Sequence, residues 1–386
     1  MWINLITFYL MIKFWDYAIE YKELRKKIIN NIDKVFKSGD LIFGRQIKLF
    51  EKSFIKKNKS KFGIALNSGT DAIYIALKSL NIGANDEVIT VSNTAIPTVA
   101  AIKNTGAKIL FVDVNDDYLI NTNKIEEKIT KNTKAIVVVH LYGQACDINH
   151  LLKLSKKYKI DIIEDCAQSF GAKFQNKVVG NFGTFGCFSF YPTKILGTYG
   201  DGGFLTTNNK LLYEKTKRIR FYGIESSNPK KEFYNEYYSY ENGTNSRLSE
   251  IQSSILNIKI NKIDKDIKRR REIAEIYFSN LKDIGLTLPR RRKDFFDVYH
   301  LFVVRHQKRD EIIKSVRKEI EIKIHYKYPN HKMQAYSNYV CEKCNCLGKT
   351  ESFSKEIFSL PLYPELTNTK VFKIIKVLKK TLNQLR

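Results

Sequence analysis

Cysteine, proline and long uncharged stretches are all scarce in this sequence. Its 386 residues include 6 cysteines and 7 prolines, and so few cysteines exclude a small secreted fold held together by disulfides. The one largely apolar stretch, residues 1–15 with Lys13 as its only charge, is too short to span a bilayer and lacks the features of a signal peptide. We therefore expect a cytoplasmic protein with no membrane segment, in which residues 1–10 are an extension upstream of Met11.

Acidic residues are also few relative to basic ones. The chain has 66 Lys and Arg against 40 Asp and Glu, and its formal charge of +26 suggests a nucleic-acid partner at first sight. However, 51 of the basic residues are Lys and only 15 are Arg, whereas nucleic-acid sites favour the bidentate hydrogen bonding of arginine. The basic residues are also spread over the whole length, apart from short runs at 269–271 and 290–292. The sequence therefore predicts no nucleic-acid partner.

Three of the six cysteines lie close together near the C-terminus. Cys341, Cys344 and Cys346 could offer thiolates to zinc, with His331 as a fourth ligand. A structural zinc site usually has a second clear ligand pair, and the sequence contains none. We therefore expect free thiols in a loop and no metal.

Hydrophobic patterning over residues 60–210 predicts an α/β domain. Short β-branched runs alternate with amphipathic segments, which is typical of a largely parallel sheet with helices on both faces. Two further short runs, 185–190 and 203–207, flank a loop rich in Gly, Pro and Thr. The expected strands are 87–91, 108–113, 135–141 and 161–165, and the expected helices are 71–80, 97–105 and 149–158.

The pattern changes after residue 246. Residues 247–281 predict one long charged helix of the kind that connects domains, followed by a strand at 298–304 and helices at 310–320 and 370–385. We therefore expect residues 1–246 to form an N-terminal helix and a large α/β domain. Residues 247–386 are then a connecting helix and a smaller α+β domain.

Two motifs fall where a doubly wound sheet binds its ligands. Ser68-Gly69-Thr70 opens the helix after an expected strand, so its backbone N–H groups could receive a phosphate or could simply form a helix N-cap. Asp165 ends a buried strand, where a carboxylate needs a cationic or hydrogen-bonding partner. That partner is either a pyridinium nitrogen or the start of the next segment, and the residues alone favour neither.

A third motif singles out one lysine. Lys194 follows Tyr191 and Pro192 in a turn crowded by aromatic side chains, and four glycines come within the next nine residues. Partial desolvation lowers the pKa of a lysine amine and makes it a nucleophile toward carbonyl groups. Most lysines only solvate a surface, so the context of Lys194 is what marks it. A fourth motif around Asn245 is polar and precedes the long helix, where it could be an ordinary loop and cap.

Together and in this order, these motifs resemble the DegT/DnrJ/EryC1/StrS family of pyridoxal-phosphate sugar aminotransferases. The resemblance runs from about residue 14 to the C-terminus and also includes Gly44 and the sequence motifs at residues 93–98 and 245–252. It implies the aspartate-aminotransferase fold type I, with a large mixed but mostly parallel sheet and a smaller α+β C-terminal domain. It also implies pyridoxal 5′-phosphate as cofactor, with pyridoxamine phosphate as its form in the second half-reaction.

The resemblance assigns the catalytic chemistry to two residues. Lys194 matches the lysine that bonds to the cofactor and moves a proton between the substrate carbon and the cofactor's C4′. Asp165 matches the carboxylate that pairs with the pyridinium nitrogen. Relatives that dehydrate sugars carry His at the position of Lys194, so we do not expect a dehydratase.

The remaining cofactor contacts are also carried over from the family. Gln168 corresponds to the polar neighbour of the cofactor's 3-oxygen, and Asn245 to a residue that reaches the phosphate from the partner subunit. The resemblance therefore implies an obligate homodimer with shared active sites. Where several family members stack an aromatic ring on the cofactor, this sequence has Ala95. The expected phosphate contacts are Gly69, Thr70, the backbone of Asp71, and Ser189.

The substrate is implied only by the subgroup that the chain resembles. His325 and Tyr326 match residues placed against a sugar nucleotide, and Tyr191 is expected to line the same pocket. Three segments, residues 93–98, 298–304 and 324–331, look most like the subgroup that aminates C3 of a dTDP-linked 3-oxo-6-deoxyhexose. The resemblance implies L-glutamate as the amino donor and a role in the synthesis of bacterial surface glycans. A 4-aminotransferase acting on a dTDP- or UDP-linked 4-oxo sugar is the alternative. A non-catalytic regulator on the same fold is a more distant one. The configuration at C4, gluco or galacto, stays open.

Overall fold

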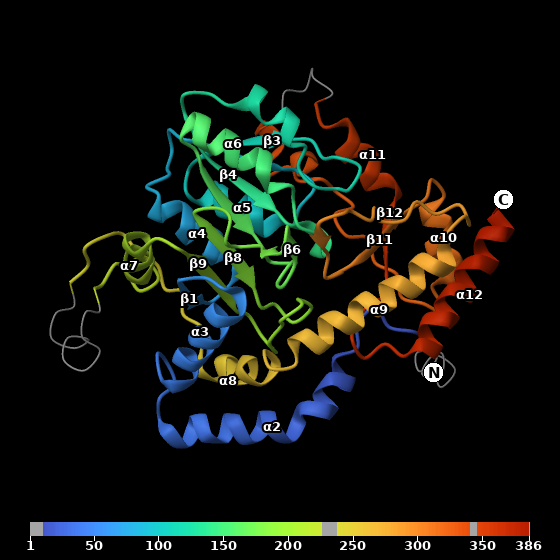
Figure 1. The fold of residues 1–386 in the computed structure, drawn as a ribbon, viewed down its shortest axis with the longest axis horizontal. Coiled ribbons are helices and arrows are strands. Elements are labelled where there is room, and N and C mark those ends of the chain that lie inside the picture. The colour runs from blue at the N-terminus through green and yellow to red at the C-terminus, as the bar shows by residue number, and fades with distance from the viewer. Residues whose placement is uncertain (1–10, 226–237, 340–345, 386) are drawn as a thin grey trace.

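The computed structural model describes residues 11–225, 238–339 and 346–385, and a seven-stranded sheet forms its centre (Figure 1). The strand order is β1-β9-β8-β5-β4-β2-β3. Three further short strands, β6 (Lys173–Phe174), β7 (Lys177–Val178) and β10 (Phe295–Phe296), form a separate small sheet. The strands of the central sheet are β1 (Phe62–Leu66), β2 (Glu87–Val91), β3 (Lys108–Val112), β4 (Thr133–Val139), β5 (Asp161–Asp165), β8 (Phe185–Ser189) and β9 (Gly203–Thr207).

The central sheet is mixed but mostly parallel, which confirms the expected fold class. Only β9 runs opposite to its neighbours, pairing antiparallel with both β1 and β8, while β3, β2, β4, β5 and β8 pair in parallel. The carboxyl ends of the parallel strands therefore meet at one edge of the sheet, where α/β folds bind their ligands. The expected strands at 87–91, 161–165 and 203–207 have the bounds that the sequence predicts, and the others differ by one or two residues.

Helices cover both faces of this sheet, so its strands are hydrophobic on both sides. Ile136, Val138 and Ile162 pack with α3, α6 and α8 (Glu250–Lys259), whereas Val137 and Ile163 pack with α4, α5 and α7. The helices of the central part of the chain are α3 (Arg45–Asn58), α4 (Gly69–Ser79), α5 (Ile96–Asn104), α6 (Ile148–Tyr158) and α7 (Lys210–Ile219). Short 3-10 turns lie at Thr122–Lys124, Glu126–Lys128, Leu141–Gly143, Asn330–Lys332 and Ser337–Tyr339.

The expected single helix over residues 247–281 is wrong, because the structure divides it into α8 (Glu250–Lys259) and α9 (Ile263–Leu281). The two helices have different packing partners. Helix α8 lies against α3 and the long N-terminal α2 (Tyr17–Ser38), and α9 packs against the C-terminal α12 (Asn368–Leu385). Because of the turn between them, α8 packs with the N-terminal part of the chain and α9 packs with the C-terminal part (Figure 1). The periodicity of residues 247–281 does not reveal this break.

A second hydrophobic core lies in the C-terminal part of the chain. It is built from α9, α12, α10 (Arg309–Val316) and the hairpin of β11 (Phe302–Arg305) with β12 (Ile357–Leu360). The predicted strand at 298–304 therefore begins later, at Phe302. The N-terminal residue Ile12 joins this core and pairs in parallel with Ile320. Conversely, helix α11 (Gly348–Glu356) is tied to the large sheet, because the Lys349 and Thr350 N–H groups donate to Asp113. The division of the chain at residue 246 therefore stays a proposal. Ile12 and helix α11 each pack with the part of the chain on the other side of that boundary.

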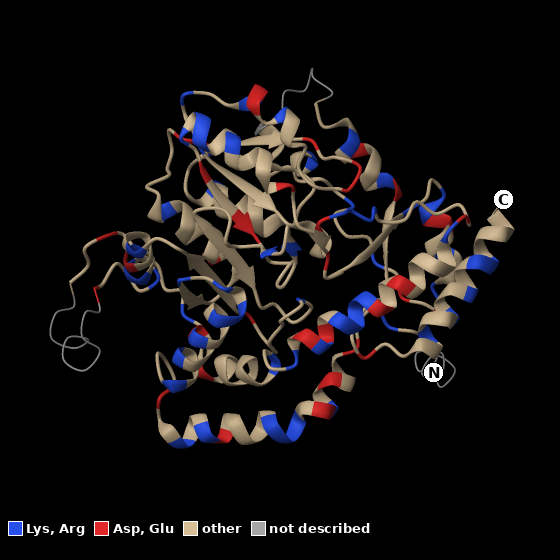
Figure 2. Cartoon of the chain, viewed as in Figure 1, with Lys and Arg blue, Asp and Glu red and all other residues tan. Residues whose placement is uncertain are grey.

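Basic and acidic residues are spread over many elements of the chain rather than gathered on one of them. Figure 2 shows Lys and Arg on α2, α7, α9 and α12, with Asp and Glu interspersed on α2 and α9. No helix in the described ranges is long and apolar enough to cross a membrane. Cys341 and Cys344 lie outside the described residues, so the expectation of free thiols there is not tested. Cys346, which lies inside them, is partly buried and packs against the hydrophobic core.

Candidate active site

A cavity of about 300 Å³ opens where β5 and β8 end and α4 and α5 begin. It brings together side chains from segments that lie far apart in the sequence. Seven of the sequence-predicted residues line it: Gly69, Thr70, Asp165, Gln168, Ser189, Tyr191 and Lys194.

The first wall of the cavity is the start of helix α4. Ser68 caps the helix, since its hydroxyl accepts the Asp71 N–H at 3.1 Å. The N–H groups of Gly69 and Thr70 have no acceptor within the helix and none among the described residues, so they are free for an anion. A Cβ on Gly69 would lie 2.8 Å from the Cβ of Ser189, so only glycine allows this close approach. The helix N-cap is therefore observed, and the phosphate contact of Gly69 and Thr70 stays a prediction.

Asp71, by contrast, does not line the cavity. Its N–H is taken by Ser68, and its carboxylate accepts the Ser246 hydroxyl at 2.7 Å. Ser246 in turn accepts the Asn67 N–H at 3.1 Å. Asp71 therefore ties the start of α4 to the segment around residue 246, and its expected role as a phosphate contact stays a prediction.

Asp165, at the carboxyl end of β5, is buried and has only neutral partners. Its Oδ2 accepts the Thr98 hydroxyl at 2.7 Å, and its Oδ1 accepts the Ala167 N–H at 3.0 Å. No Lys, Arg or His of the described ranges lies within ion-pair distance of this carboxylate. A buried carboxylate of this kind is costly without a cation. It therefore suits a cationic group of a bound molecule.

Lys194 projects from the turn after β8. The backbone N–H of Lys194 donates to the Tyr191 carbonyl at 2.9 Å. The backbone N–H of Thr198 donates to the Phe190 carbonyl at 2.8 Å and closes the turn. A Cβ on Gly197 would lie 2.4 Å from the Pro192 carbonyl oxygen, so the turn needs glycine at that position. Desolvation lowers the pKa of Lys194 to about 8, and the charge of Asp165 offsets part of this effect. The amine is thus more readily deprotonated than that of an ordinary lysine.

Gln168 connects the cavity to the C-terminal part of the chain. Its Oε1 accepts the Tyr142 N–H at 2.8 Å, and its Nε2 donates to the Tyr326 hydroxyl. Tyr326 also stacks on Tyr142, with ring centroids 6.0 Å apart. Tyr326 therefore lies behind Gln168 rather than among the residues that line the cavity.

His325 lines a second cavity, of about 290 Å³, on the other side of the Lys194 turn. Its Nδ1 lies 2.8 Å from the Ser359 hydroxyl. Burial and the nearby Lys194 lower the pKa of His325 to about 4, so its imidazole is neutral at pH 7. The structure thus places His325 near the lysine, separated from the first cavity by the turn.

Asn245 is exposed and does not line the cavity of its own chain. Its Oδ1 accepts the Arg247 Nε–H at 2.8 Å, and its backbone pairs with Phe221. Its expected contact with a partner subunit's site stays a prediction.

Another acid, Glu164, shows what a purely structural carboxylate looks like in this fold. It is fully buried, and it accepts the N–H groups of Gly180, Phe182 and Gly183 as well as His140 Nε2. His140 Nδ1 accepts the Cys146 N–H, so the proton of this imidazole is on Nε2 and points at Glu164. His140, Glu164 and Cys166 have atoms close enough to hold a metal, but these hydrogen bonds already occupy Glu164 and His140.

The residues of the first cavity fit pyridoxal phosphate. The free N–H groups of Gly69 and Thr70 suit its phosphate, the buried Asp165 carboxylate suits a pyridinium, and the Lys194 amine suits its aldehyde. Ala95 also lines the cavity, so the side chain at this position is a methyl group.

Sequence reasoning missed Thr98 as a functional residue. Its hydroxyl holds Asp165 and also lies 3.1 Å from the Thr94 hydroxyl. The only signal was its place directly after Pro97 at the start of an expected helix on the ligand-binding edge. Because Thr98 and Asp165 are 67 positions apart, only the packing of α5 beside β5 identifies the contact.

Comparison with known proteins agrees with this geometry. The family model described as the DegT/DnrJ/EryC1/StrS aminotransferase family matches residues 22–379. The dTDP-3-amino-3,4,6-trideoxy-alpha-D-glucose transaminase of Micromonospora megalomicea subsp. nigra is 39% identical over 378 residues, 96% of this chain and 99% of the relative. The dTDP-3-amino-3,6-dideoxy-alpha-D-galactopyranose transaminase of Aneurinibacillus thermoaerophilus is 39% identical over 373 residues, with the same coverage. The crystal structure of S. venezuelae DesV superimposes with a TM-score of 0.91 at 33% identity, covering 96% of this chain and 98% of DesV.

The lowered pKa of Lys194 predicts a gain in stability when its charge is removed. In cofactor-free protein at pH 7, Lys194→Met should raise the free energy of unfolding by up to about 3 kcal/mol, because the folded state holds a desolvated ammonium. Since the folded pKa lies below the unfolded one, the gain should shrink as the pH rises from about 8 and vanish above about 10.5. Urea unfolding at pH 7, 9 and 10 measures it. Equal stability of the two proteins at every pH would contradict the assignment.

The hydrogen bond from Thr98 predicts a second effect. Thr98→Val removes the hydroxyl that Asp165 Oδ2 accepts and should lower the free energy of unfolding by about 1–3 kcal/mol. It should also weaken cofactor binding, because the carboxylate is free to turn. Thr98→Ser keeps the hydroxyl and is the matched control. Urea unfolding and equilibrium dialysis of the cofactor give the two readouts, and a Ser variant as impaired as the Val variant would assign the effect to packing.

Proposed function

Because the chain belongs to the DegT/DnrJ/EryC1/StrS aminotransferase family, whose cofactor is pyridoxal phosphate, we propose that it aminates C3 of a dTDP-linked 3-oxo-6-deoxyhexose. The amino donor in this proposal is L-glutamate. Two relatives of 39% identity are named as transaminases of dTDP-3-amino sugars, which supports C3 and the dTDP carrier. The product would serve the synthesis of bacterial surface glycans.

The observation that carries this proposal is the shared cavity of Lys194, Asp165 and the start of α4. When bound, the cofactor supplies an electron sink and carries the amino group between the two half-reactions. The protein supplies the rest. The N–H groups of Gly69 and Thr70 hold the phosphate, and Asp165 keeps the pyridine nitrogen protonated.

Lys194 acts as both the attachment point and the acid–base in this proposal. Its amine, with a pKa of about 8, can lose a proton near neutral pH and return it. It takes the proton from the donor's α-carbon in the first half-reaction and delivers one to sugar C3 in the second. The turn that carries Lys194 is closed by backbone hydrogen bonds, so the amine returns to the same place in both half-reactions.

His325, Tyr326 and Tyr191 remain our candidates for sugar contacts. Tyr191 is half exposed at the mouth of the cavity, and His325 lies near Lys194, as its lowered pKa reflects. Tyr326 would act through Gln168, to which it is hydrogen-bonded.

We further propose a homodimer with shared sites. Large apolar side chains are exposed on and after α2, which packs on one side only, against α8. In this proposal a second subunit covers them, and Asn245 of each subunit reaches the cavity of the other. These exposed side chains are Ile29, Phe36, Leu41, Ile42 and Leu49.

The carbon that receives the amine can be tested directly. With dTDP-4-oxo-6-deoxyglucose and glutamate, we expect amination only when a 3,4-ketoisomerase is added, because a misplacement of about 1 Å costs about a hundredfold in rate. Mass spectrometry and NMR of the product identify the aminated carbon. Efficient amination at C4 without the isomerase would make the protein a 4-aminotransferase.

Shared active sites predict complementation. Lys194→Ala and Asn245→Ala should each be nearly inactive, but a mixture with random subunit exchange should recover about a quarter of the parent activity, because half of the dimers then carry one intact site. Exchange is followed with two different affinity tags. A mixture of Lys194→Ala with Asp165→Asn is the control, since both changes fall in the same chain's cavity. Exchange without recovered activity in the first mixture would place Asn245 outside the partner's site.

A further inference from the structure

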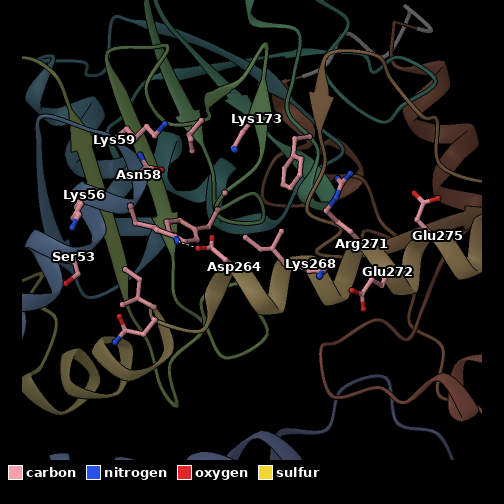
Figure 3. Close-up of a pocket in the computed structure, with 18 residues that line it drawn as sticks. Ser53, Lys56, Asn58, Lys59, Lys173, Asp264, Lys268, Arg271, Glu272 and Glu275 are labelled. Carbon is pink, nitrogen blue, oxygen red and sulfur yellow. Dashed lines mark hydrogen bonds and ion pairs between the residues drawn. The ribbon is translucent and has the colours of Figure 1, made fainter.

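A second large groove lies apart from the catalytic cavity. It has a volume of about 890 Å³ and lies between the end of α3, the β6–β7 hairpin and α9 (Figure 3). None of its 18 lining residues lines the catalytic cavity. The groove is therefore separate from the cavity that holds Lys194 and Asp165.

Most of the cations in this groove have no anionic partner. The three acids are already paired: Asp264 with Lys57, Glu272 with Arg269 at 3.4 Å, and Glu275 with Arg291 at 2.6 Å. Arg269 and Arg291 lie outside the groove, so they neutralise its acids without using its cations. Within the described part of the chain, no carboxylate lies within ion-pair distance of the five that remain: Lys56, Lys59, Lys173, Lys268 and Arg271.

Two of these cations are held in place by one aromatic ring. The Arg271 guanidinium lies 4.0 Å and the Lys173 ammonium 5.2 Å from the centre of the Phe296 ring. Arg271 also donates to the Asp297 carbonyl at 2.6 Å. The positive charge in this part of the groove is therefore positioned rather than carried by freely moving surface side chains.

A buried acceptor in the same groove lacks a donor. Asn58 is 1% exposed, and its Nδ2 donates to Ser60, but its Oδ1 has no partner among the described residues. A buried carbonyl oxygen without a donor costs about 1–3 kcal/mol, so a hydroxyl of a bound molecule would stabilise it. Asn58 lines the groove beside Lys59 (Figure 3).

From these contacts we propose that the groove binds a small molecule that carries both phosphate and hydroxyl groups, of the nucleotide or sugar-phosphate class. The five cations attract the phosphates, and Asn58 Oδ1 accepts a hydroxyl.

The test uses the cofactor-loaded enzyme and three probes: ATP, ribose 5-phosphate and inorganic tripolyphosphate. Calorimetric titration at 50 mM salt should give binding of ATP that weakens at 300 mM salt. The double variant Lys59→Glu/Lys268→Glu reverses one charge on each side of the groove and should weaken ATP binding about tenfold or more. Lys373→Glu/Lys376→Glu on the exposed face of α12 changes the net charge equally and is the matched control.

The outcomes separate this proposal from the proposed function. We expect the control pair to bind ATP within about twofold of the parent, and both double variants to keep transaminase activity. Equal weakening in both pairs would mean general charge attraction, and no binding at 50 mM salt would mean no site; either result overturns the proposal. Tripolyphosphate that binds as tightly as ATP would overturn the role of Asn58. Weaker tripolyphosphate binding supports that role, and binding of ribose 5-phosphate extends the class to sugar phosphates.

Discussion

The buried carboxylate of Asp165 is the constraint around which the active site is arranged. It stands at the end of β5 with two neutral donors, Thr98 and the Ala167 N–H, and with no cation of the described chain in ion-pair distance. An isolated charge in such a place is costly, so a cationic group of a bound molecule would stabilise it. A pyridinium is such a cation.

The neighbouring Glu164 shows the opposite solution to the same problem. Successive residues of a strand point to opposite faces, so the two acids have separate surroundings. Glu164 accepts three backbone N–H groups and one imidazole N–H, and these bonds fix the loop 180–183 against β5. One carboxylate therefore stabilises the fold and the next one serves the site. Their difference lies entirely in the donors that the tertiary structure offers.

Residues from the C-terminal part of the chain form hydrogen bonds with the segment beside the active site, so the two parts are not independent there. Asn330, from the C-terminal part, donates to the carbonyls of Ser92 and Thr94, and His331 Nδ1 lies 2.6 Å from the Ser92 hydroxyl. These contacts hold the segment that leads from β2 to Thr98. Since Thr98 in turn donates a hydrogen bond to Asp165, the C-terminal part of the chain helps to position this carboxylate. The Gln168–Tyr326 hydrogen bond is a second link of the same kind.

The sequence alone was enough to predict the sheet-based fold and to single out Lys194 and Asp165, which the structure brings into one cavity. It could do so because strand periodicity, helix caps and the turn glycines are local patterns, and because the ordered motifs resemble one family. Local pattern did not reveal the break between α8 and α9, the donors to Asp165, the saturation of Glu164, or the exclusion of Asp71 and Asn245 from the cavity of their own chain. Each of these depends on which segments pack together. Thr98 and Asp165 are 67 positions apart, and Gln168 and Tyr326 are 158 apart. Contacts over such separations form only when the hydrophobic faces of the helices pack against one another. They can therefore be identified only in the tertiary structure.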